Sequence, residues 1–312
     1  MERLETEIYL RYKQIIESQG AVVPAGYQSP APQCVRMEDL LDRYDAFCFD
    51  GYGTLYNRGS FVYEGALDWY TMLRAAGKQM RLITNAASDV DSVLAADAAK
   101  RGFAFSEAET ISSGSLLKDL CVELRGRGKA VREVYYIGRE TGKHVLESCG
   151  ITAVSLDVEP AEPIVAISSA KETPETYEQA VKILKRAGSM LLVLNSDAWA
   201  PKIPGDDGVT VREPVSGALS ERLRRDSMCE ANGGAGCETF YLGKPFPAIW
   251  EKVKRSLSEG SRVLMVGDTL GTDVLGAKIA GFDSALVVGR NVPTAELEAD
   301  EKVLEIRPDY YL

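Results

Sequence analysis

Several polar side chains follow closely after short apolar segments of this 312-residue chain, where strands would end. They are Asp50, the pair Thr84-Asn85, Lys244 and Asp268. Two carboxylates, a lysine and a hydroxyl–amide pair suit a divalent cation that prefers oxygen ligands, together with a doubly charged anion. One strand ending in Asp is a weak signal, because Asp is common in turns and helix caps. Four such strand ends in one chain are a stronger signal.

The segments that would position these residues alternate between strand and helix patterns. Short apolar runs predict strands at residues 46–50, 80–84, 134–137, 164–167, 190–194, 240–242, 262–266 and 285–288. Helical patterns between them cover residues 65–76, 90–100, 174–187 and 247–257, and a further helix runs through Ala280. Such alternation predicts an α/β fold with mainly parallel sheets. Because open parallel sheets bind ligands at the carboxyl ends of their strands, we expect the polar strand ends to converge.

Composition and charge limit the classes of partner. The chain has 36 Lys and Arg against 46 Asp and Glu, a formal net charge of −10, which disfavours binding to nucleic acid or an anionic membrane surface. We see no apolar window long enough to cross a membrane and no basic, then apolar, leader. The single histidine, His144, argues against a multi-histidine metal site. No Cys-x-x-Cys pair occurs among the six cysteines, which favours reduced thiols and a cytoplasmic location.

Four short motifs on these strand ends together resemble the haloacid dehalogenase superfamily of hydrolases and phosphotransferases. In chain order they are Phe47-Cys-Phe-Asp50-Gly-Tyr52-Gly53-Thr54-Leu55, Leu82-Ile-Thr84-Asn85, Gly243-Lys244-Pro245 and Met265-Val-Gly267-Asp268-Thr-Leu-Gly-Thr-Asp273. Each motif alone is short, but their order and their positions on strand ends make the resemblance specific. It covers roughly residues 40–290.

The spacing of the motifs indicates where a second domain is inserted. Thr84 and Lys244 are 160 residues apart, whereas Asp50 and Thr84 are only 34 apart. This pattern resembles subclass IIA, which holds phosphatases of pyridoxal phosphate, nitrophenyl phosphate and nucleotides. The resemblance implies a Rossmann-like parallel-sheet core with an inserted α/β cap domain. We expect an N-terminal helix and linker at 1–37, the core at 38–125 and 226–312, and the cap at 126–225.

The resemblance implies a role for each motif residue. Asp50 would be the nucleophile that forms an aspartyl-phosphate, and Lys244 would pair with Asp50 and the phosphoryl group. Mg²⁺ would be bound by Asp50, Asp268 and the backbone carbonyl of Tyr52. Asp273 would hold a metal-bound water or orient Lys244.

The remaining assignments concern the phosphate and the substrate. Thr84 and the backbone of Asn85 would bind phosphoryl oxygens, and Gly53 would permit the sharp turn that aims the nucleophile. Cap residues would choose the leaving group of a small phosphorylated metabolite. The candidates for this contact are Tyr135, Lys171, Asn195, Asp197 and Trp199. Relatives of this subclass often form homodimers through the cap, so that assembly is an expectation here too.

Tyr52 is the departure from the phosphatase pattern. Phosphatases of this superfamily usually carry a second Asp two residues after the nucleophile, which protonates the leaving group and then activates water. Tyr52 stands at that position here, and a phenol with a pKa of about 10 is a poor general base near neutral pH. Tyr at this place is similar to the 2-haloacid dehalogenases, whose halide leaving group needs no proton.

Three functions therefore stay open at this point. The first is a Mg²⁺-dependent phosphatase with altered proton chemistry, in which Tyr52 takes part. The second is a 2-haloacid dehalogenase-like hydrolase; Asp268 disfavours it, because those enzymes work without metal and carry a neutral residue there. The third is a catalytically weak protein that still binds phosphate and metal.

Overall fold

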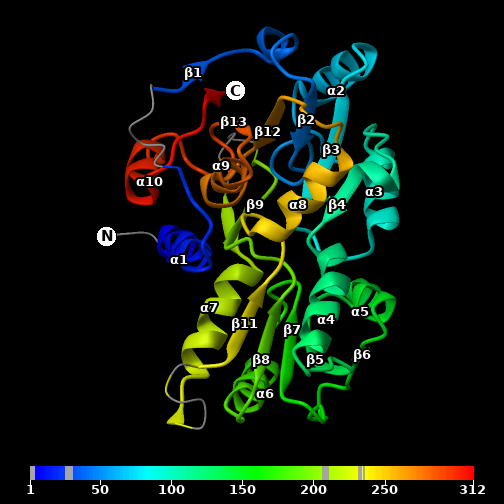
Figure 1. Ribbon diagram of the computed structural model, residues 1–312, viewed down its shortest axis with the longest axis vertical. Helices are drawn as coiled ribbons and strands as arrows, with labels where there is room; N and C mark the ends of the chain where they lie inside the picture. The colour runs from blue at the N-terminus through cyan, green and yellow to red at the C-terminus, as the bar shows by residue number, and fades with distance from the viewer. Residues whose placement is uncertain (1–3, 25–30, 206–210, 231–233, 235) are drawn as a thin grey trace.

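The chain folds into two α/β bodies, each built on a parallel sheet (Figure 1). This computed structural model describes residues 4–24, 31–205, 211–230, 234 and 236–312. The larger sheet, which we name the core sheet, has the order β1-β14-β13-β12-β2-β3-β4, and all its neighbours are parallel. Its strands are β1 (Gln33–Cys34), β2 (Ala46–Phe49), β3 (Gln79–Thr84), β4 (Thr110–Ser112), β12 (Val263–Gly267), β13 (Asp283–Leu286) and β14 (Tyr310–Tyr311).

The smaller sheet, which we name the cap sheet, is also parallel throughout, in the order β11-β8-β7-β5-β6. Its strands are β5 (Glu133–Ile137), β6 (Thr152–Ala153), β7 (Ile164–Ile167), β8 (Met190–Val193) and β11 (Glu238–Tyr241). A short antiparallel pair, β9 (Trp199–Pro201) and β10 (Arg212–Pro214), extends from this body toward the core. Every strand predicted from an apolar run overlaps a strand of one of the two parallel sheets, which confirms the α/β fold class.

One predicted boundary differs from the structure. The motif spacing predicts a return to the core at residue 226, yet β11 pairs with β8 in the cap sheet. The chain therefore re-enters the core only after Tyr241, directly before Lys244. The apolar run of β11 adjoins the third motif in sequence, so sequence proximity pointed to the core. Pairing along the free edge of β8 instead decides which sheet receives this strand.

Two helices show clear sequence signals at their ends. Thr173 caps α6 by accepting a hydrogen bond from the backbone N–H of Thr176, and Pro174 occupies its first position. Gly281 ends α9 at a positive φ of 73°. The helices are α1 (Leu4–Ser18), α2 (Ala66–Ala75), α3 (Asp91–Lys100), α4 (Leu117–Gly126), α5 (Lys143–Ser148), α6 (Pro174–Leu184), α7 (Ser216–Asp226), α8 (Pro247–Ser256), α9 (Leu275–Ala280) and α10 (Leu297–Leu304).

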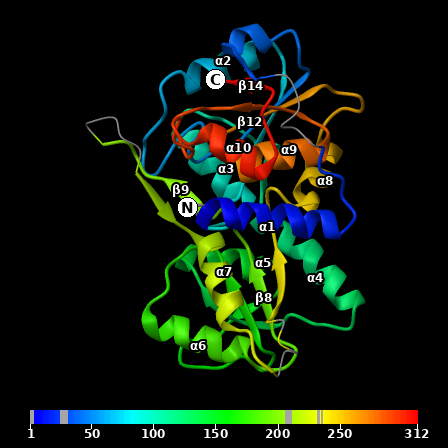
Figure 2. The same ribbon diagram turned by 90° about the vertical axis from the view of Figure 1, so that its left-hand side faces the viewer.

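Helix α1 lies across the junction of the two bodies (Figure 2). This helix is the one expected within residues 1–37, and its Tyr12 and Ile16 side chains are fully buried. The Tyr12 hydroxyl donates to the backbone carbonyl of Ser196 at 3.0 Å, on the loop that follows β8 of the cap sheet. Lys13, on the same helix, donates to the carbonyl of Leu304 in α10 at 3.0 Å. The helix thus contacts both bodies. Part of the predicted linker, residues 25–30, lies outside the described residues.

One continuous apolar cluster joins the two sheets. It includes Cys48 and Met265 from the core sheet and Val134 and Leu192 from the cap sheet. Burial of such a shared cluster favours a fixed arrangement of the two bodies, since separating them would expose apolar surface to water. Among the described residues, no helix is both long and apolar enough for a membrane crossing.

Candidate active site

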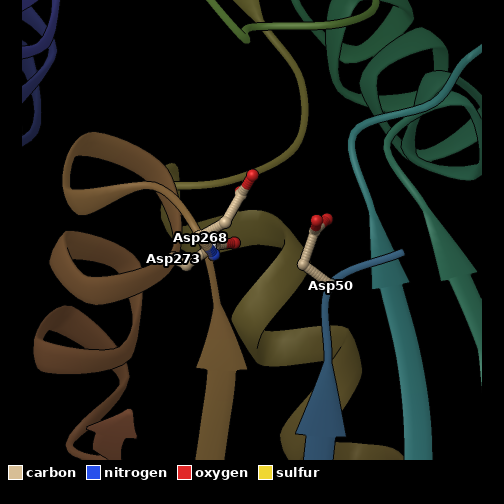
Figure 3. Close-up of side chains that lie close together, drawn as sticks. All are labelled: Asp50, Asp268 and Asp273. Atoms are coloured by element: carbon tan, nitrogen blue, oxygen red, sulfur yellow. Dashed lines mark hydrogen bonds between the residues drawn. The ribbon is translucent and has the colours of Figure 1, made fainter. Parts of the chain in front are cut away.

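The carboxyl ends of β2 and β12 bring Asp50 and Asp268 together (Figure 3). The two strands are parallel neighbours with Phe49 opposite Val266, and the N–H of Asp50 donates to the Val266 carbonyl at 2.9 Å. Both strands are fully buried apolar runs, typical of a parallel sheet covered on both faces. The register of β2 and β12 therefore brings these two strand ends together, as predicted.

Three buried carboxylates form the centre of the site. Asp50, Asp268 and Asp273 each offer an oxygen within 4.8 Å of the others. Burial raises the pKa of Asp268 well above its usual value, and the charges of Asp50 and Asp273 raise it further. The pKa of Asp50 is raised by burial as well, against the opposing effect of Lys244. Burying several ionised carboxylates this close together destabilises the folded protein unless a cation neutralises their charge.

Lys244 supplies one of the balancing charges. Its ammonium lies 2.6 Å from Asp50 Oδ1 and 2.7 Å from Asp273 Oδ1, and its third bond goes to the Ile83 carbonyl at 3.1 Å. The side chain is 1% exposed. Burial alone would lower its pKa, but the charges of Asp273 and Asp50 hold that pKa above its ordinary value. Lys244 is therefore a fixed cation between two acids.

Asp273 is fully engaged in holding this arrangement. While its Oδ1 accepts from Lys244, its Oδ2 accepts the backbone N–H groups of Asp268 and Thr269, at 3.2 and 3.1 Å. Of the two roles predicted for Asp273, this geometry matches orientation of Lys244. The same bonds position the loop that carries Asp268.

Asp268 differs from Asp273 because one of its carboxylate oxygens accepts no hydrogen bond from the described residues. Its Oδ1 accepts from the Thr269 hydroxyl at 2.9 Å, but its Oδ2 is buried with no hydrogen-bond partner among the described residues. A buried, raised-pKa carboxylate oxygen without a donor is destabilising by itself. The donor set, two acids facing each other with one oxygen of Asp268 unpaired, fits a divalent cation with oxygen ligands.

Gly53 leaves the space in which this oxygen sits. Its φ is +101°, a conformation that favours glycine, and a Cβ added there would lie 1.9 Å from Asp268 Oδ2. Glycine is therefore required at this position both for the backbone turn and for the side chain of Asp268.

Asn85 ties the second motif to the third. Its Oδ1 accepts the backbone N–H of Lys244 at 2.7 Å, and its Nδ2 donates to the Lys244 carbonyl and to Asp197 Oδ1. Its side chain thus links the core to the cap, a contact not anticipated when only its backbone was assigned a role. Thr84 ends β3 beside it, and the Thr84 hydroxyl accepts the N–H of Ala86 at 3.1 Å.

Two cavities lie over the acids. The larger, of about 330 Å³, is lined from the core by Asp50, Tyr52 and Thr84 and from the cap by Asn195 and Asp197. A smaller one, of about 40 Å³, lies over Asp50, Asp268 and Asp273 and is bordered by Trp199. The larger volume matches ordinary small-molecule sites.

Tyr52 lines both cavities. Its ring packs edge-on against Tyr56, with 5.1 Å between the ring centroids. Burial raises the pKa of its phenol, and the charge of Asp97 raises it further against nearby arginines. The phenol is therefore neutral near pH 7 and can donate a hydrogen bond into the cavity, but it is a weak base.

The predicted cap contacts divide into two groups. Asn195 and Asp197 line the larger cavity, and burial raises the pKa of Asp197 to about 6. Trp199 borders the smaller cavity, where a substrate contact remains a prediction. Tyr135 is wrong as a contact, because its side chain packs inside the cap core. Lys171 is exposed and lies outside the lining of both cavities.

Three arginines outside the four motifs and the predicted cap contacts also line the larger cavity. They are Arg58, Arg101 and Arg139. Arg139 stands two residues after β5, so inspection of every strand end would have found it. The other two lie on a loop and just beyond the last turn of α3, where basic residues are ordinary. No local pattern distinguishes them.

Comparison with known proteins matches both halves of the site. A family model described as haloacid dehalogenase-like hydrolase matches residues 47–152, and a HAD-hydrolase-like model matches residues 241–312. The two ranges carry Asp50 and Lys244 respectively. Chronophin of Mus musculus is 26% identical over 288 residues, covering 88% of this chain and 92% of that protein.

Solved structures show a similar fold. A possible sugar phosphatase of the HAD superfamily from Cytophaga hutchinsonii has a TM-score of 0.73 at 23% identity, covering 90% of this chain and 97% of the other. The glycerol phosphate phosphatase of Mycobacterium tuberculosis, solved in complex with magnesium, has a TM-score of 0.64 at 25% identity. That match covers 88% of this chain and 76% of the other.

Proposed function

This chain belongs to the haloacid dehalogenase-like hydrolases, and we propose that it is a Mg²⁺-dependent phosphatase of small phosphate esters. The observation that carries the proposal is the unpaired Oδ2 of Asp268 beside Asp50, with Lys244 fixed between Asp50 and Asp273. Similar proteins support it by their names: phosphoglycolate phosphatase 2 of Arabidopsis thaliana aligns over 90% of the chain, and the aligned glycerol phosphate phosphatase was solved with magnesium.

Asp50 and Asp268 would hold the ion, and the backbone carbonyl of Tyr52 is a third predicted ligand. When bound, Mg²⁺ would neutralise the charge of the nucleophile and of the phosphate. Asp273 contributes indirectly, because both of its oxygens already accept hydrogen bonds. The choice of Mg²⁺ among oxygen-preferring cations rests on the family and on the small, acid-lined space.

Asp50 would act as the nucleophile. A bond forms between one of its carboxylate oxygens and phosphorus, and the bond from phosphorus to the ester oxygen breaks, so that the leaving group departs as an anion that takes a proton from water. Water then attacks the aspartyl-phosphate, which releases inorganic phosphate and restores the carboxylate. Lys244 favours the ionised form of Asp50 and holds it in place. Thr84, which lines the larger cavity, and the backbone of Asn85 would receive phosphoryl oxygens.

Tyr52 restricts which esters react well. A phenol can donate a hydrogen bond to a departing oxygen, but it serves poorly as the base that activates water. We therefore expect fast turnover of esters whose leaving groups are stable anions, such as nitrophenolate. The dehalogenase alternative is disfavoured by the acid cluster, because without a cation two further acids near Asp50 would weaken it as a nucleophile.

The test is hydrolysis of p-nitrophenyl phosphate with and without Mg²⁺. We expect Mg²⁺-dependent turnover in the wild type, its loss in Asp50→Asn, and its retention in Asp157→Asn, which removes an exposed acid of the cap. Full activity in Asp50→Asn would rule out Asp50 as the nucleophile. Metal-independent halide release from 2-haloacids would instead support the dehalogenase function, and ligand binding without any turnover would support a binding protein.

A further inference from the structure

The lining of the larger cavity contains two chemically different sets of groups. Near Asp50 and Thr84 it carries the groups assigned to the phosphoryl group. Around the Tyr52 phenol it carries three arginines, and the charges that act on this phenol come from one acid, Asp97, and from Arg101, Arg139 and Arg58. Two of these arginines are already paired, Arg101 with Asp97 and Arg58 with Glu213.

Arg101 is held rigidly in the cavity wall. Its side chain is 6% exposed, and its Nη1 donates to Asp97 Oδ2 at 2.6 Å. The guanidinium carbon lies 4.8 Å from the centroid of the Tyr56 ring, the same ring against which Tyr52 packs. Its Nε is buried without a hydrogen-bond partner among the described residues. Asp97 therefore positions Arg101 and leaves part of its donor capacity unused.

The cap supplies the opposite wall. Arg139 follows β5, and Ser169 follows β7, so both lie at carboxyl ends of the cap sheet, facing the carboxyl ends of the core sheet across the cavity. No ion-pair partner of the Arg139 side chain is found in the described part of the chain. The Ser169 hydroxyl is buried without a hydrogen-bond partner there. Arg58 differs from these, because Glu213 on β10 already pairs with it.

We propose that Arg101 and Arg139, with the Ser169 hydroxyl, form a subsite for a second anionic group carried by the leaving-group half of the substrate. The substrate class is then a small phosphate ester that also bears a carboxylate or a second phosphate. This inference rests on the proposed phosphatase function and narrows it. Guanidinium groups bind both anions through paired hydrogen bonds, so the cavity chemistry is shared by the two.

The size of the cavity agrees with this substrate class. A volume of about 330 Å³ must hold the phosphoryl group and the whole leaving group. Pockets at the lower end of the usual range of roughly 300–1,000 Å³ accept metabolite-sized ligands.

Matched esters test the subsite. Three probes are used. Phosphoglycolate carries a carboxylate on its leaving group, ethane-1,2-diol bisphosphate carries a second phosphate there, and 2-hydroxyethyl phosphate has an uncharged leaving group and is called the neutral ester. We expect the wild type to prefer one or both anionic esters over the neutral one by about 10- to 100-fold in kcat/KM, as charge-assisted hydrogen bonds allow. Arg139→Gln should reduce that preference by about 10-fold, and Arg139→Lys should reduce it less, because charge remains but the paired donors are lost.

Arg132→Gln is the matched control. Arg132 is exposed just before β5, at the end of that strand away from the cavity, and its loss changes the net charge equally. It should leave the preference unchanged. Equal kcat/KM for the neutral and both anionic esters in the wild type would overturn the subsite, and so would equal losses on all three in Arg139→Gln.

If the protein were not a phosphatase, the experiment would give a different result from the two that overturn the subsite. In that case the wild type would hydrolyse neither these esters nor p-nitrophenyl phosphate with Mg²⁺. Calorimetric binding of phosphoglycolate and of 2-hydroxyethyl phosphate to the wild type and to Arg139→Gln would then decide the subsite on its own. Tighter binding of the anionic ester that depends on Arg139 supports it, and equal binding contradicts it.

Discussion

Gly53 and Asp268 lie so close together that a single methyl group on Gly53 would overlap the carboxylate, at 1.9 Å from Oδ2. The two residues come from loops after neighbouring strands, β2 and β12, and are 215 positions apart in the chain. The oxygen concerned is the one without a partner among the described residues. A residue without a side chain thus preserves the position of a proposed metal ligand.

Gly53→Ala should therefore weaken metal activation as well as stability. The positive φ alone should lower the free energy of unfolding by about 1–3 kcal/mol, and displacement of Asp268 should raise the Mg²⁺ concentration for half-maximal turnover about 10-fold or more. Gly77→Ala is the control, because Gly77 also has a positive φ but has open space around it. It should lose stability only. Unchanged Mg²⁺ activation in Gly53→Ala would contradict the role given to Asp268.

Lys244→Met should destabilise the protein and abolish turnover. Removing the cation leaves Asp50 and Asp273 buried without it, which typically lowers the free energy of unfolding by about 3–5 kcal/mol. The loss should shrink at acidic pH, where the acids become protonated. Lys182→Met removes a surface lysine paired with Glu159 at the same distance of 2.6 Å and should cost about 1 kcal/mol or less. Urea unfolding of both variants measures the difference, and similar losses would refute the argument from burial.

Tyr52→Asp should restore the missing proton chemistry. We expect turnover of an alkyl phosphate to rise by about 10²–10⁴-fold, as general acid–base catalysis provides, with a smaller gain on p-nitrophenyl phosphate. The difference arises because nitrophenolate departs without a proton. Tyr52→Phe is the companion variant, and a slower alkyl phosphate reaction in it would show that the phenol donates a hydrogen bond. Equal gains on both esters in Tyr52→Asp would mean that leaving-group protonation is not what limits the wild type.

Asp197 should make stability depend on pH. Burial raises its pKa to about 6 in the folded protein, against about 4 in an unfolded chain. The protonated folded form is therefore favoured at low pH, and the stability contributed by this group falls as pH rises from about 4 through about 6. In Asp197→Asn the side-chain oxygen can still accept the hydrogen bond from Asn85, but the residue carries no charge. The free energy of unfolding of this variant should therefore exceed that of the wild type by an amount that grows as pH rises through this window. The gain should reach on the order of 2–3 kcal/mol above pH 7.

Urea unfolding of the metal-free wild type and Asp197→Asn between pH 4 and pH 7.5 measures this gain. Asp157→Asn, at an exposed position, should show no comparable trend. A gain in Asp197→Asn that stays constant with pH would mean that Asp197 does not titrate within this window.

The large parallel-sheet elements were predictable because their signals are local. Each apolar run predicts a buried strand by itself, and strand ends such as Asp50 and Asp268 follow from those runs. The sheet assignment of β11 was not predictable in the same way. Its residues read as a strand, but pairing with β8 depends on an edge formed some 45 residues earlier in the chain.

What the sequence by itself determined is therefore the α/β class, the inserted second sheet and the identity of the acids, the lysine and Tyr52. Only the tertiary structure decided that Asp273 serves Lys244, that Asp268 keeps an unpaired oxygen, and that Arg101 and Arg139 face one cavity. Motifs and periodicity indicate which functional residues a segment contains and whether it forms a strand or a helix. Which side chains share a space depends on contacts between segments far apart in the chain, and local patterns carry no record of those contacts.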